Sequence, residues 1–436
     1  MAPVTPAPEE ARRGPRPVVL HLMLATLSAS SSLAASQRLR PASPNSNASP
    51  GGARPPGSPP GSPLGSPITS PAARLERIAA ALRSGNAEAA FPAALLREAV
   101  GRNADLLHGI AAYRAHPHRR RLTDPPAVWE EGGSRLLDYG VGDAEVVALV
   151  VPSLVNRASV LDLAEGHSML RWLAQSGVRP LLLDWGWPGE TERRFTMTDY
   201  VAGRLERALA VARRLARKRV ALIGYCMGGD LALAAAQRRP DLVRGLALLA
   251  TPWDFHTGND GAALARLLPV LEPMMTATGT LPIDALQTLF ALLDPFGVVH
   301  KYAAFSHLDP EGERARLFVA LEDWLNDGVP LAGPVARECL QSWYGRNDPA
   351  HGRWRIAGAP VDAKTIRMPA FVAVPDRDRI VPPASALPLA LGIRGAVLHQ
   401  PKAGHVGMVA GSSAEAVLWQ PLRAWLATLA SKRRPR

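Results

Sequence analysis

Six short apolar runs recur between residues 145 and 400, and each has the length of a β-strand. Most of them are apolar throughout, which is typical of strands buried on both faces of a parallel sheet. Segments with a helical spacing of apolar residues separate them. The order strand, helix, strand predicts an α/β fold with a doubly wound, mostly parallel sheet. The predicted strands are 145–151, 180–184, 219–223, 245–250, 369–374 and 396–400, and the predicted helices are 168–176, 198–217, 230–238 and 419–431.

The interval between the fourth and fifth predicted strands, residues 251–368, is longer than a crossover helix needs. Apolar residues recur in it with helical spacing at 264–275, 283–293 and 315–326. We therefore expect an inserted helical cap over the carboxyl ends of the strands. Most of its aromatic residues are expected to pack in a core, and a substrate tunnel is the alternative. The predicted core then comprises residues 72–250 and 369–430.

The first 71 residues combine an apolar segment with a low-complexity linker. The apolar stretch 18–29 follows three arginines, which gives the outline of a secretory signal with a possible cleavage site at 32–34. Two prolines and a histidine interrupt this outline, so we favour a segment that docks on the main domain or on a hydrophobic surface. Residues 41–71 are almost only Pro, Ser, Gly, Asn and Ala, which predicts a disordered linker. Short helices are expected from about residue 72 to about residue 121.

The composition indicates a globular protein of the cell interior. Of the 436 residues, 47% are hydrophobic and 20% are charged, so a sizeable core is available. The two cysteines, Cys226 and Cys339, are too few for a disulfide framework and lack the spacing of a metal site. We therefore predict no metal or cofactor site and a reducing, cytoplasmic compartment. No apolar run approaches the length of a membrane-spanning helix.

The net charge of +12 reflects an excess of arginine and lysine and includes a basic tail at residues 431–436. Solvated surface charge is the first explanation for such a balance. Contact with an anionic surface is the second explanation. We predict no nucleic-acid partner.

The stretch 220–229 reads V-A-L-I-G-Y-C-M-G-G and precedes a helix-like run that begins at Asp230. A buried strand, a sharp glycine-bounded turn and a helix predict a nucleophile elbow, and the nucleophile here would be Cys226. Glycine is required at 224 and 228 because a side chain there would collide with the strand or the helix. The N-terminus of the helix favours the thiolate over the thiol. The alternative is a buried cysteine on a Gly-rich turn, such as a phosphate-binding turn.

A cysteine nucleophile needs a base and a group that orients the base, and both follow in the chain order of α/β-hydrolases. His405 lies between small residues after the sixth predicted strand and would accept the thiol proton. Asp378, in the loop after the fifth predicted strand, would fix the tautomer of His405. Asp376 is the alternative carboxylate. We prefer Asp378 because it directly precedes the residues where the chain leaves the loop.

The loop after the first predicted strand, residues 152–157, is expected to complete the site. In this fold such a loop supplies one oxyanion donor, and the residue after the nucleophile supplies the other. We therefore predict backbone donors at Met227 and near Leu154. A turn without a catalytic role is the alternative for the loop.

Ordered motifs surround these candidates over residues 138–426. They are N-R-A-S-V-L-D-L at 156–163, S-M-L-R-W-L at 168–173, L-D-W-G-W-P at 183–188, T-D-Y at 198–200, G-Y-C-M-G-G at 224–229, T-P-W-D-F at 251–255, A-L-E-D-W-L-N-D-G-V-P at 320–330, D-R-I-V-P at 378–382 and G-H-V-G at 404–407. In order and spacing they resemble polyhydroxyalkanoate synthases, and most closely the shorter synthases that work with a second subunit. The sequence departs from that pattern at Arg379, where the family usually has histidine, and at Trp253, which replaces a smaller apolar residue.

The resemblance implies an α/β-hydrolase fold and an acyltransferase that joins (R)-3-hydroxyacyl units from coenzyme A thioesters into a polyester. Coenzyme A would leave as a product, and no separate cofactor is implied. The implied partners are the acyl-coenzyme A substrate, the growing polyester chain, a second synthase subunit or a second copy of the chain, and the surface of a polyester granule. One alternative is a thioesterase or an intracellular polyester depolymerase of the same fold. Another is a non-catalytic granule-associated protein.

Overall fold

The computed structural model describes most of the chain from residue 90 onward and a shorter N-terminal part. The described residues are 12, 14–38, 76–78, 80–81, 84, 90–142, 144–257, 261–294 and 297–431. The predicted linker at 41–71 and the basic residues 432–436 lie outside these ranges.

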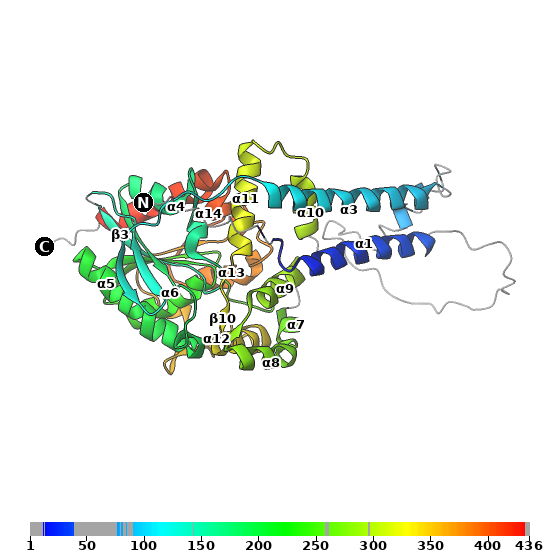
Figure 1. The fold of residues 1–436 in the computed structure, drawn as a ribbon. Helices are drawn as coiled ribbons and strands as arrows, with labels where there is room; N and C mark the ends of the chain where they lie inside the picture. The colour runs from blue at the N-terminus through cyan, green and yellow to red at the C-terminus, as the bar shows by residue number, and fades with distance from the viewer. Residues whose placement is uncertain are drawn as a thin grey trace, which may run out of the picture.

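One eight-stranded sheet forms the centre of the fold (Figure 1). Its order is β1-β2-β6-β3-β7-β8-β13-β14, and the strands from β6 to β14 are parallel to their neighbours. The six predicted strands are all present, so the α/β prediction is confirmed. The hairpin β1–β2, which joins β6 antiparallel, was not predicted because its residues are short, partly charged runs at a sheet edge. The strands are β1 Ala127–Glu131, β2 Ser134–Asp138, β3 Val146–Val151, β6 Val178–Asp184, β7 Val220–Tyr225, β8 Val243–Leu249, β13 Ala370–Ala373 and β14 Val397–His399.

Helices cover both faces of the sheet, which is why its strands are apolar throughout. Successive residues of β3 point to opposite sides: Leu149 and Val151 belong to one core cluster, and Ala148 and Val150 belong to the other. The first cluster includes residues of α5, α6 and α13, and the second includes residues of α4, α14 and α15. These helices are α4 Met169–Gln175, α5 Glu206–Ala216, α6 Met227–Arg238, α13 Pro383–Gly392, α14 Gly407–Ala410 and α15 Gln420–Ser431.

The segment between β8 and β13 contains a series of helices. The predicted helix 283–293 is present with the same bounds as α9. The predicted helix 264–275 is wrong, because two helices divide it and the second begins with a proline in its first turn, where a missing N–H costs nothing. Two further helices, α10 and α12, were not predicted. The helices of this segment are α7 Gly261–Ala265, α8 Leu268–Thr278, α9 Ile283–Leu293, α10 Gly297–Phe305, α11 Glu313–Asn326 and α12 Gly333–Glu338, followed by a π-helical turn at Cys339–Gly345.

Two long helices, α1 (Val18–Arg38) and α3 (Phe91–Ala115), project from the rest of the molecule side by side (Figure 1). The expected short helices of this region are in part wrong, because α3 is one continuous helix of 25 residues. Ala25 of α1 is buried in one cluster with Leu106 of α3 and Tyr302 of α10. The described part of the apolar N-terminal segment therefore packs against α3 and α10.

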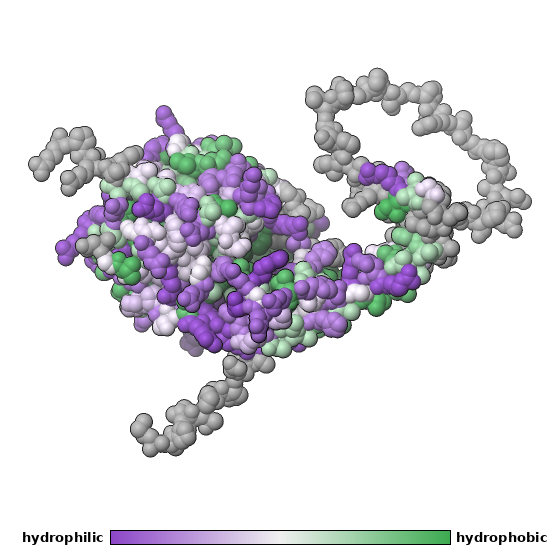
Figure 2. All heavy atoms as spheres, turned by 90° about the horizontal axis from the view of Figure 1, so that it is seen from above, coloured by the Kyte–Doolittle hydropathy of each residue, from purple (hydrophilic) through white to green (hydrophobic). Residues whose placement is uncertain are grey.

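Helices α1 and α3 together form what we call the arm. The arm also exposes apolar side chains to solvent, which are seen as green spheres in Figure 2. On α1, Val19, Met23 and Leu27 are each about 60% exposed and follow one another at a spacing of four residues. On α3, Val100 and Leu107 are more than half exposed. No helix among the described residues is long and apolar enough to cross a membrane.

Candidate active site

Cys226 lies between β7 and α6 in a backbone conformation that few residues adopt. Its φ of 55° and ψ of −133° indicate a sharp turn that the surrounding structure imposes. Its N–H donates a hydrogen bond to the carbonyl of Leu249 on β8 at 2.8 Å. A Cβ on Gly224 would overlap the backbone of Gly229, and a Cβ on Gly228 would overlap carbonyl oxygens at the end of β3. The two glycines therefore make this turn possible.

His405 and Asp378 lie on the loops after β14 and β13 and face each other. The His405 Nδ1 and Asp378 Oδ2 atoms are 2.7 Å apart. The other carboxylate oxygen, Oδ1, accepts hydrogen bonds from the backbone N–H groups of Ile380 and Val381, each at 2.8 Å. The alternative carboxylate, Asp376, is 42% exposed and belongs to a surface ion pair. The structure thus brings Asp378, and not Asp376, to the histidine.

The surroundings of His405 favour its charged form. Burial opposes the imidazolium, but the Asp378 carboxylate and the neighbouring Cys226 outweigh burial and raise the pKa of His405 to about 10. A thiolate beside an imidazolium is the state in which a cysteine attacks, so this arrangement suits nucleophilic catalysis. The hydroxyl of Tyr225 donates to the His405 carbonyl at 3.3 Å, and the two ring centroids are 5.3 Å apart. The sequence offered no signal for this contact, because it depends on how two distant loops meet.

The loop after β3 lies beside Cys226. Ser153 and Val155 line the space next to Cys226, whereas the side chain of Leu154 is buried. Met227 is the first residue of α6, and the N–H groups of a first helical turn have no partner within the helix. The donor roles of Leu154 and Met227 stay predictions.

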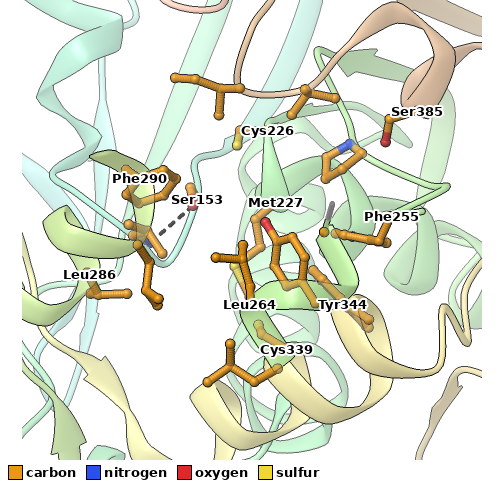
Figure 3. A pocket seen from close by; sticks show the side chains of 18 of the residues that line it. Ser153, Cys226, Met227, Phe255, Leu264, Leu286, Phe290, Cys339, Tyr344 and Ser385 are labelled. Carbon is orange, nitrogen blue, oxygen red and sulfur yellow. Dashed lines mark hydrogen bonds between the residues drawn. The ribbon is translucent and has the colours of Figure 1, made fainter. Parts of the chain in front are cut away.

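An apolar cavity of about 140 Å³ extends from Cys226 to the helices between β8 and β13. Figure 3 shows Leu264, Leu286 and Phe290 among the side chains around it, with Cys339 also lining it. The substrate tunnel, which was the alternative to core packing for the aromatic residues of this segment, stays a prediction. The aromatic residues that line this cavity are Phe255, Phe290, Trp343 and Tyr344. Others, such as Tyr302 and Phe305, pack against α3 instead.

A second cavity, of about 280 Å³, also reaches Cys226 and is richer in charged residues. His405 lines this cavity and not the apolar one. Arg379, at the position where the resembled family usually has histidine, lines both cavities and lies 3.3 Å from Asp294 at the end of α9. Cys226 is thus reached from an apolar side and from a polar side.

Asp230 is a feature of the site that the sequence analysis did not single out. It lies one turn after Cys226 on α6, it is 0% exposed, and neither of its carboxyl oxygens has a hydrogen-bond partner among the described residues. Burial, with the charge of Cys226 added, raises the pKa of Asp230 well above its ordinary value. A lone carboxylate in the otherwise apolar run of α6 was the available signal. No group of three or more His, Cys, Asp or Glu side chains in the described part of the chain could hold a metal ion.

The fold and the elbow define the class of protein. A family model described as "alpha/beta hydrolase fold" matches residues 149–272, from β3 through the elbow to α8. A mostly parallel sheet with a candidate nucleophile after β7 and a histidine after the last strand agrees with that match. The chain therefore has the α/β-hydrolase fold.

Three polymerase subunits from other organisms are similar to this chain in sequence. The chain is 29% identical over 319 residues to the poly(3-hydroxyalkanoate) polymerase subunit PhaC of Haloferax mediterranei. The alignment covers 70% of this chain and 64% of that protein, so this chain spans less than two thirds of the length of that relative. It is 29% identical to the PhaC of Synechocystis, with 64% of this chain and 77% of that protein covered. With the PhaC of Allochromatium vinosum it shares 28% identity over 69% of this chain and 87% of that protein. These similarities confirm the resemblance inferred from the motifs.

Proposed function

We propose that the chain is a polyhydroxyalkanoate synthase that joins (R)-3-hydroxyacyl units from coenzyme A thioesters through an acyl-cysteine intermediate. The observation that carries this proposal is a cysteine at the elbow, beside a paired His405 and Asp378, in a relative of poly(3-hydroxyalkanoate) polymerase subunits. The elbow of this fold commonly carries serine. A cysteine suits exchange between thioesters, because one thiolate attacks while another leaves.

In the first step the Cys226 thiolate attacks the carbonyl carbon of the substrate thioester. The new carbon–sulfur bond forms, the bond to the coenzyme A sulfur breaks, and the His405 imidazolium gives its proton to the leaving thiolate. Asp378 stabilises the imidazolium before the transfer, which agrees with the raised pKa of His405. Backbone N–H groups at Met227 and in the loop after β3 are the proposed donors to the oxyanion.

In the second step the neutral His405 accepts the proton of a 3-hydroxyl group, and the hydroxyl oxygen attacks the acyl-Cys226 carbonyl. An ester bond forms, the acyl–sulfur bond breaks, and the thiolate–imidazolium pair returns. Water in place of the hydroxyl would give a free acid instead. The partition between polyester and acid therefore depends on how well water is excluded from the site.

The apolar cavity is the proposed place for the acyl group. Its walls include residues of α7, of α9 and of the π-helical turn that contains Cys339. Most of the lining side chains are apolar. An apolar wall excludes water and offers few hydrogen bonds to a polar competitor. The shape of this wall then sets which side chains of the 3-hydroxyacyl unit fit.

We place the enzyme in the cytoplasm, at the surface of polyester granules. The support is the exposed apolar stripe of Val19, Met23 and Leu27 on α1, next to exposed apolar residues of α3. Exposed apolar surface of this kind is typical of a site that binds an apolar surface or a partner. A second synthase subunit or a second copy of the chain is the proposed partner on the same arm.

The test is a product assay on the purified full-length chain. With (R)-3-hydroxybutyryl-coenzyme A, the proposal predicts release of coenzyme A together with formation of chloroform-soluble polyester. Mass spectrometry of the quenched enzyme should show an acyl group on the Cys226 peptide. The acyl group should be absent from Cys226→Ala and should still form in Cys339→Ala, which removes the other cysteine of the same cavity.

Two results would contradict the proposal in different ways. Release of coenzyme A with only free 3-hydroxy acid would identify a thioesterase on the same scaffold. No release of coenzyme A, with or without an added second subunit, would leave a non-catalytic granule protein. Runs with short and medium acyl chains would then define the substrate range.

A further inference from the structure

The polar cavity beside Cys226 is walled in part by the N-terminus of the chain. Pro15, Arg16 and His21 line this cavity together with Cys226 and His405. We call Arg12 and residues 14–21 the N-terminal strap.

Arg12 supplies the main anchor of the strap. Its side chain is 5% exposed and forms a two-pronged ion pair with Asp323 of α11, with Nε–Oδ1 and Nη2–Oδ2 distances of 2.6 Å and 3.0 Å. The guanidinium also donates to the backbone carbonyls of Tyr113, His116 and His118, where α3 ends. Arginine in such a planar, many-partnered arrangement is fixed in both position and orientation.

The strap makes further contacts on the way to α1. The backbone N–H of Arg16 donates to Asn326 Oδ1 at 2.9 Å, and the Arg16 Nε donates to Asp284 Oδ1 at 2.9 Å. The Nε of Arg114 donates to the carbonyl of Gly14 at 3.0 Å. A Cβ on Gly14 would overlap the side chain of Asn326, so the backbone of the strap lies directly against α11. The strap is therefore tied to α3, α9 and α11 at once.

His21 completes the wall at the start of α1. It is 2% exposed, and its Nε2 lies 3.3 Å from the carbonyl of Arg16. Burial lowers the pKa of His21, so this part of the wall stays uncharged at neutral pH. The strap thus supplies part of the wall on the side from which His405 is reached, with Pro15 and the uncharged His21 beside the charged Arg16.

We propose that the N-terminal strap excludes water from the acyl-cysteine and so determines that a hydroxyl group, and not water, accepts the acyl group. This inference rests on the proposed synthase function. The chemistry needs such a wall, because water competes with the 3-hydroxyl for the same neutral His405. Residues of the strap line the polar cavity and do not line the apolar one. The strap therefore determines which acceptor reacts, whereas Cys226, His405 and Asp378 determine the rate of the reaction.

The test compares two arginine variants of the full-length chain. Arg12→Ala removes the anchor to Asp323 and to the end of α3, whereas Arg102→Ala removes an exposed pair with Glu98 on the outer part of α3. The readout is the fraction of released acyl groups that appears as free acid. Arg12→Ala should raise this fraction several-fold, with coenzyme A release kept within about threefold of the wild-type rate. Arg102→Ala should leave the fraction unchanged.

A second variant and a second readout keep the test decisive if Arg12→Ala folds poorly. Arg114→Ala removes only the hydrogen bond to Gly14 and should raise the free-acid fraction to a smaller extent. Alkylation of Cys226 by iodoacetamide, followed by mass spectrometry of its peptide, should be faster in both strap variants. An unchanged partition and an unchanged alkylation rate would overturn the inference while wild-type polymerisation still stood. If the wild type itself made only free acid, the synthase function would fail instead.

Discussion

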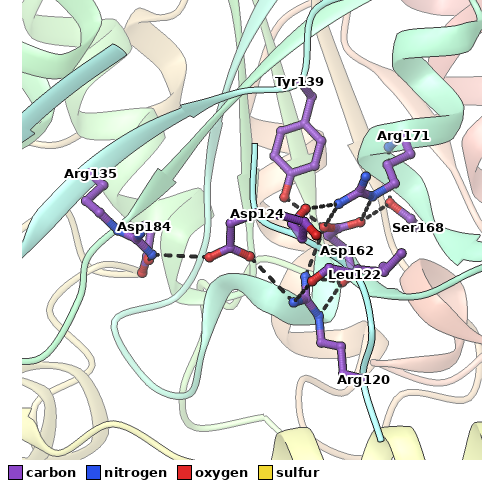
Figure 4. Close-up of polar contacts among 10 residues, drawn as sticks. Arg120, Leu122, Asp124, Arg135, Tyr139, Asp162, Ser168, Arg171 and Asp184 are labelled. Atoms are coloured by element: carbon purple, nitrogen blue, oxygen red, sulfur yellow. Dashed lines mark hydrogen bonds and ion pairs between the residues drawn. The ribbon is translucent and has the colours of Figure 1, made fainter. Parts of the chain in front are cut away.

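Two buried polar regions of this molecule are built in opposite ways. In the first, shown in Figure 4, Asp162 at the start of β4 (Asp162–Ala164) is 0% exposed and fully partnered. Its carboxylate accepts from Arg171 at 2.7 Å and 3.0 Å, from Arg120 and Tyr139 at 3.0 Å, and from Ser168 at 2.6 Å. Burial alone would raise the pKa of Asp162, but these hydrogen bonds outweigh burial and lower it.

The second region, around Cys226, keeps groups that cost stability. Cys226 has a positive φ, and Asp230 one turn later is as deeply buried as Asp162 but has no hydrogen-bond partner among the described residues. An unpartnered buried polar group destabilises a fold, and a strained backbone residue does the same. The two regions therefore differ in what they contribute to the fold: the partners of Asp162 stabilise the scaffold, whereas the strain and the unpartnered carboxyl group beside Cys226 are what the proposed catalytic role would explain. Substitutions should therefore change activity in one region and stability in the other.

The largest effect should come from the nucleophile. Cys226→Ala is expected to lower coenzyme A release at least about a thousandfold, because no second nucleophile lies at the elbow. The free energy of unfolding should change by no more than about 1 kcal/mol, since the site does not stabilise the fold. Urea unfolding followed by circular dichroism, beside the release assay, measures both. A large loss of stability in this variant would break the comparison.

Asp162→Asn should show the reverse pattern. The amide cannot accept from all four partners, so Tyr139 and Ser168 are left with buried, poorly paired hydroxyl groups. Both arginines are about one-third exposed and regain water, which limits the expected loss to about 2–3 kcal/mol of unfolding free energy. The rate of coenzyme A release per folded molecule should stay near the wild-type value.

The matched control for this variant is Asp124→Asn. Asp124 is 46% exposed and pairs with Arg120 and Arg135 at the surface, so its loss should cost less than about 1 kcal/mol. Equal effects of the two substitutions on the urea midpoint would show that burial of Asp162 does not increase its contribution to the free energy of unfolding.

The scaffold could be predicted from the sequence better than its edges. The buried strands were found because both faces are covered, so that every residue of β3 or β7 is apolar. The hairpin β1–β2 was missed because it lies at the edge, where half-exposed and charged residues give no continuous pattern. The turn at Cys226 could also be predicted from the sequence, because its geometry requires glycine at the two neighbouring positions 224 and 228.

What the sequence could not reveal depends on contacts between distant segments. The strap meets α11 through Arg12 and Asp323, and no local pattern links two residues that lie 311 positions apart in the chain. The same holds for Tyr225 and His405, which meet only when two loops come together. The preference for Asp378 over Asp376 rested on its place in the loop, and the structure puts Asp378 against His405. The catalytic roles of these residues stay predictions until the variants are measured.

Asp378→Asn should have an intermediate effect that depends on pH. Burial lowers the pKa of His405, and the Asp378 carboxylate is the largest of the contributions that nevertheless raise it to about 10. Without this carboxylate, burial disfavours the imidazolium. Coenzyme A release at neutral pH should fall by about 10- to 100-fold. The raised pKa of His405 contributes stability that is full below pH ~6.5 and is lost as the pH rises towards 10. The stability difference between wild type and variant should therefore shrink between those values.

The control for this prediction is Asp376→Asn, which removes the exposed neighbouring carboxylate. Its release rate and its stability should follow the wild-type pH profile. A loss of activity as large as that of Asp378→Asn would mean that Asp376 also acts on His405 in solution.

The smallest effect, Asp230→Asn, sharpens the comparison most, because its sign is opposite to that of Asp162→Asn. The folded-state pKa of Asp230 is raised, so the wild type loses stability as the pH rises above about 4, where the unfolded chain releases this proton. The isosteric amide cannot ionise, and its advantage should grow with pH, to about 1 kcal/mol at neutral pH. Asp162 has a lowered pKa, so the deficit of Asp162→Asn should be almost fully present at pH 4 and should shrink only in stronger acid. Thermal unfolding of both variants from pH 4 to 8 should therefore show an advantage of Asp230→Asn that grows with pH, beside a deficit of Asp162→Asn that stays nearly constant. An Asp230→Asn difference that does not grow with pH would mean that Asp230 finds a partner that keeps it charged.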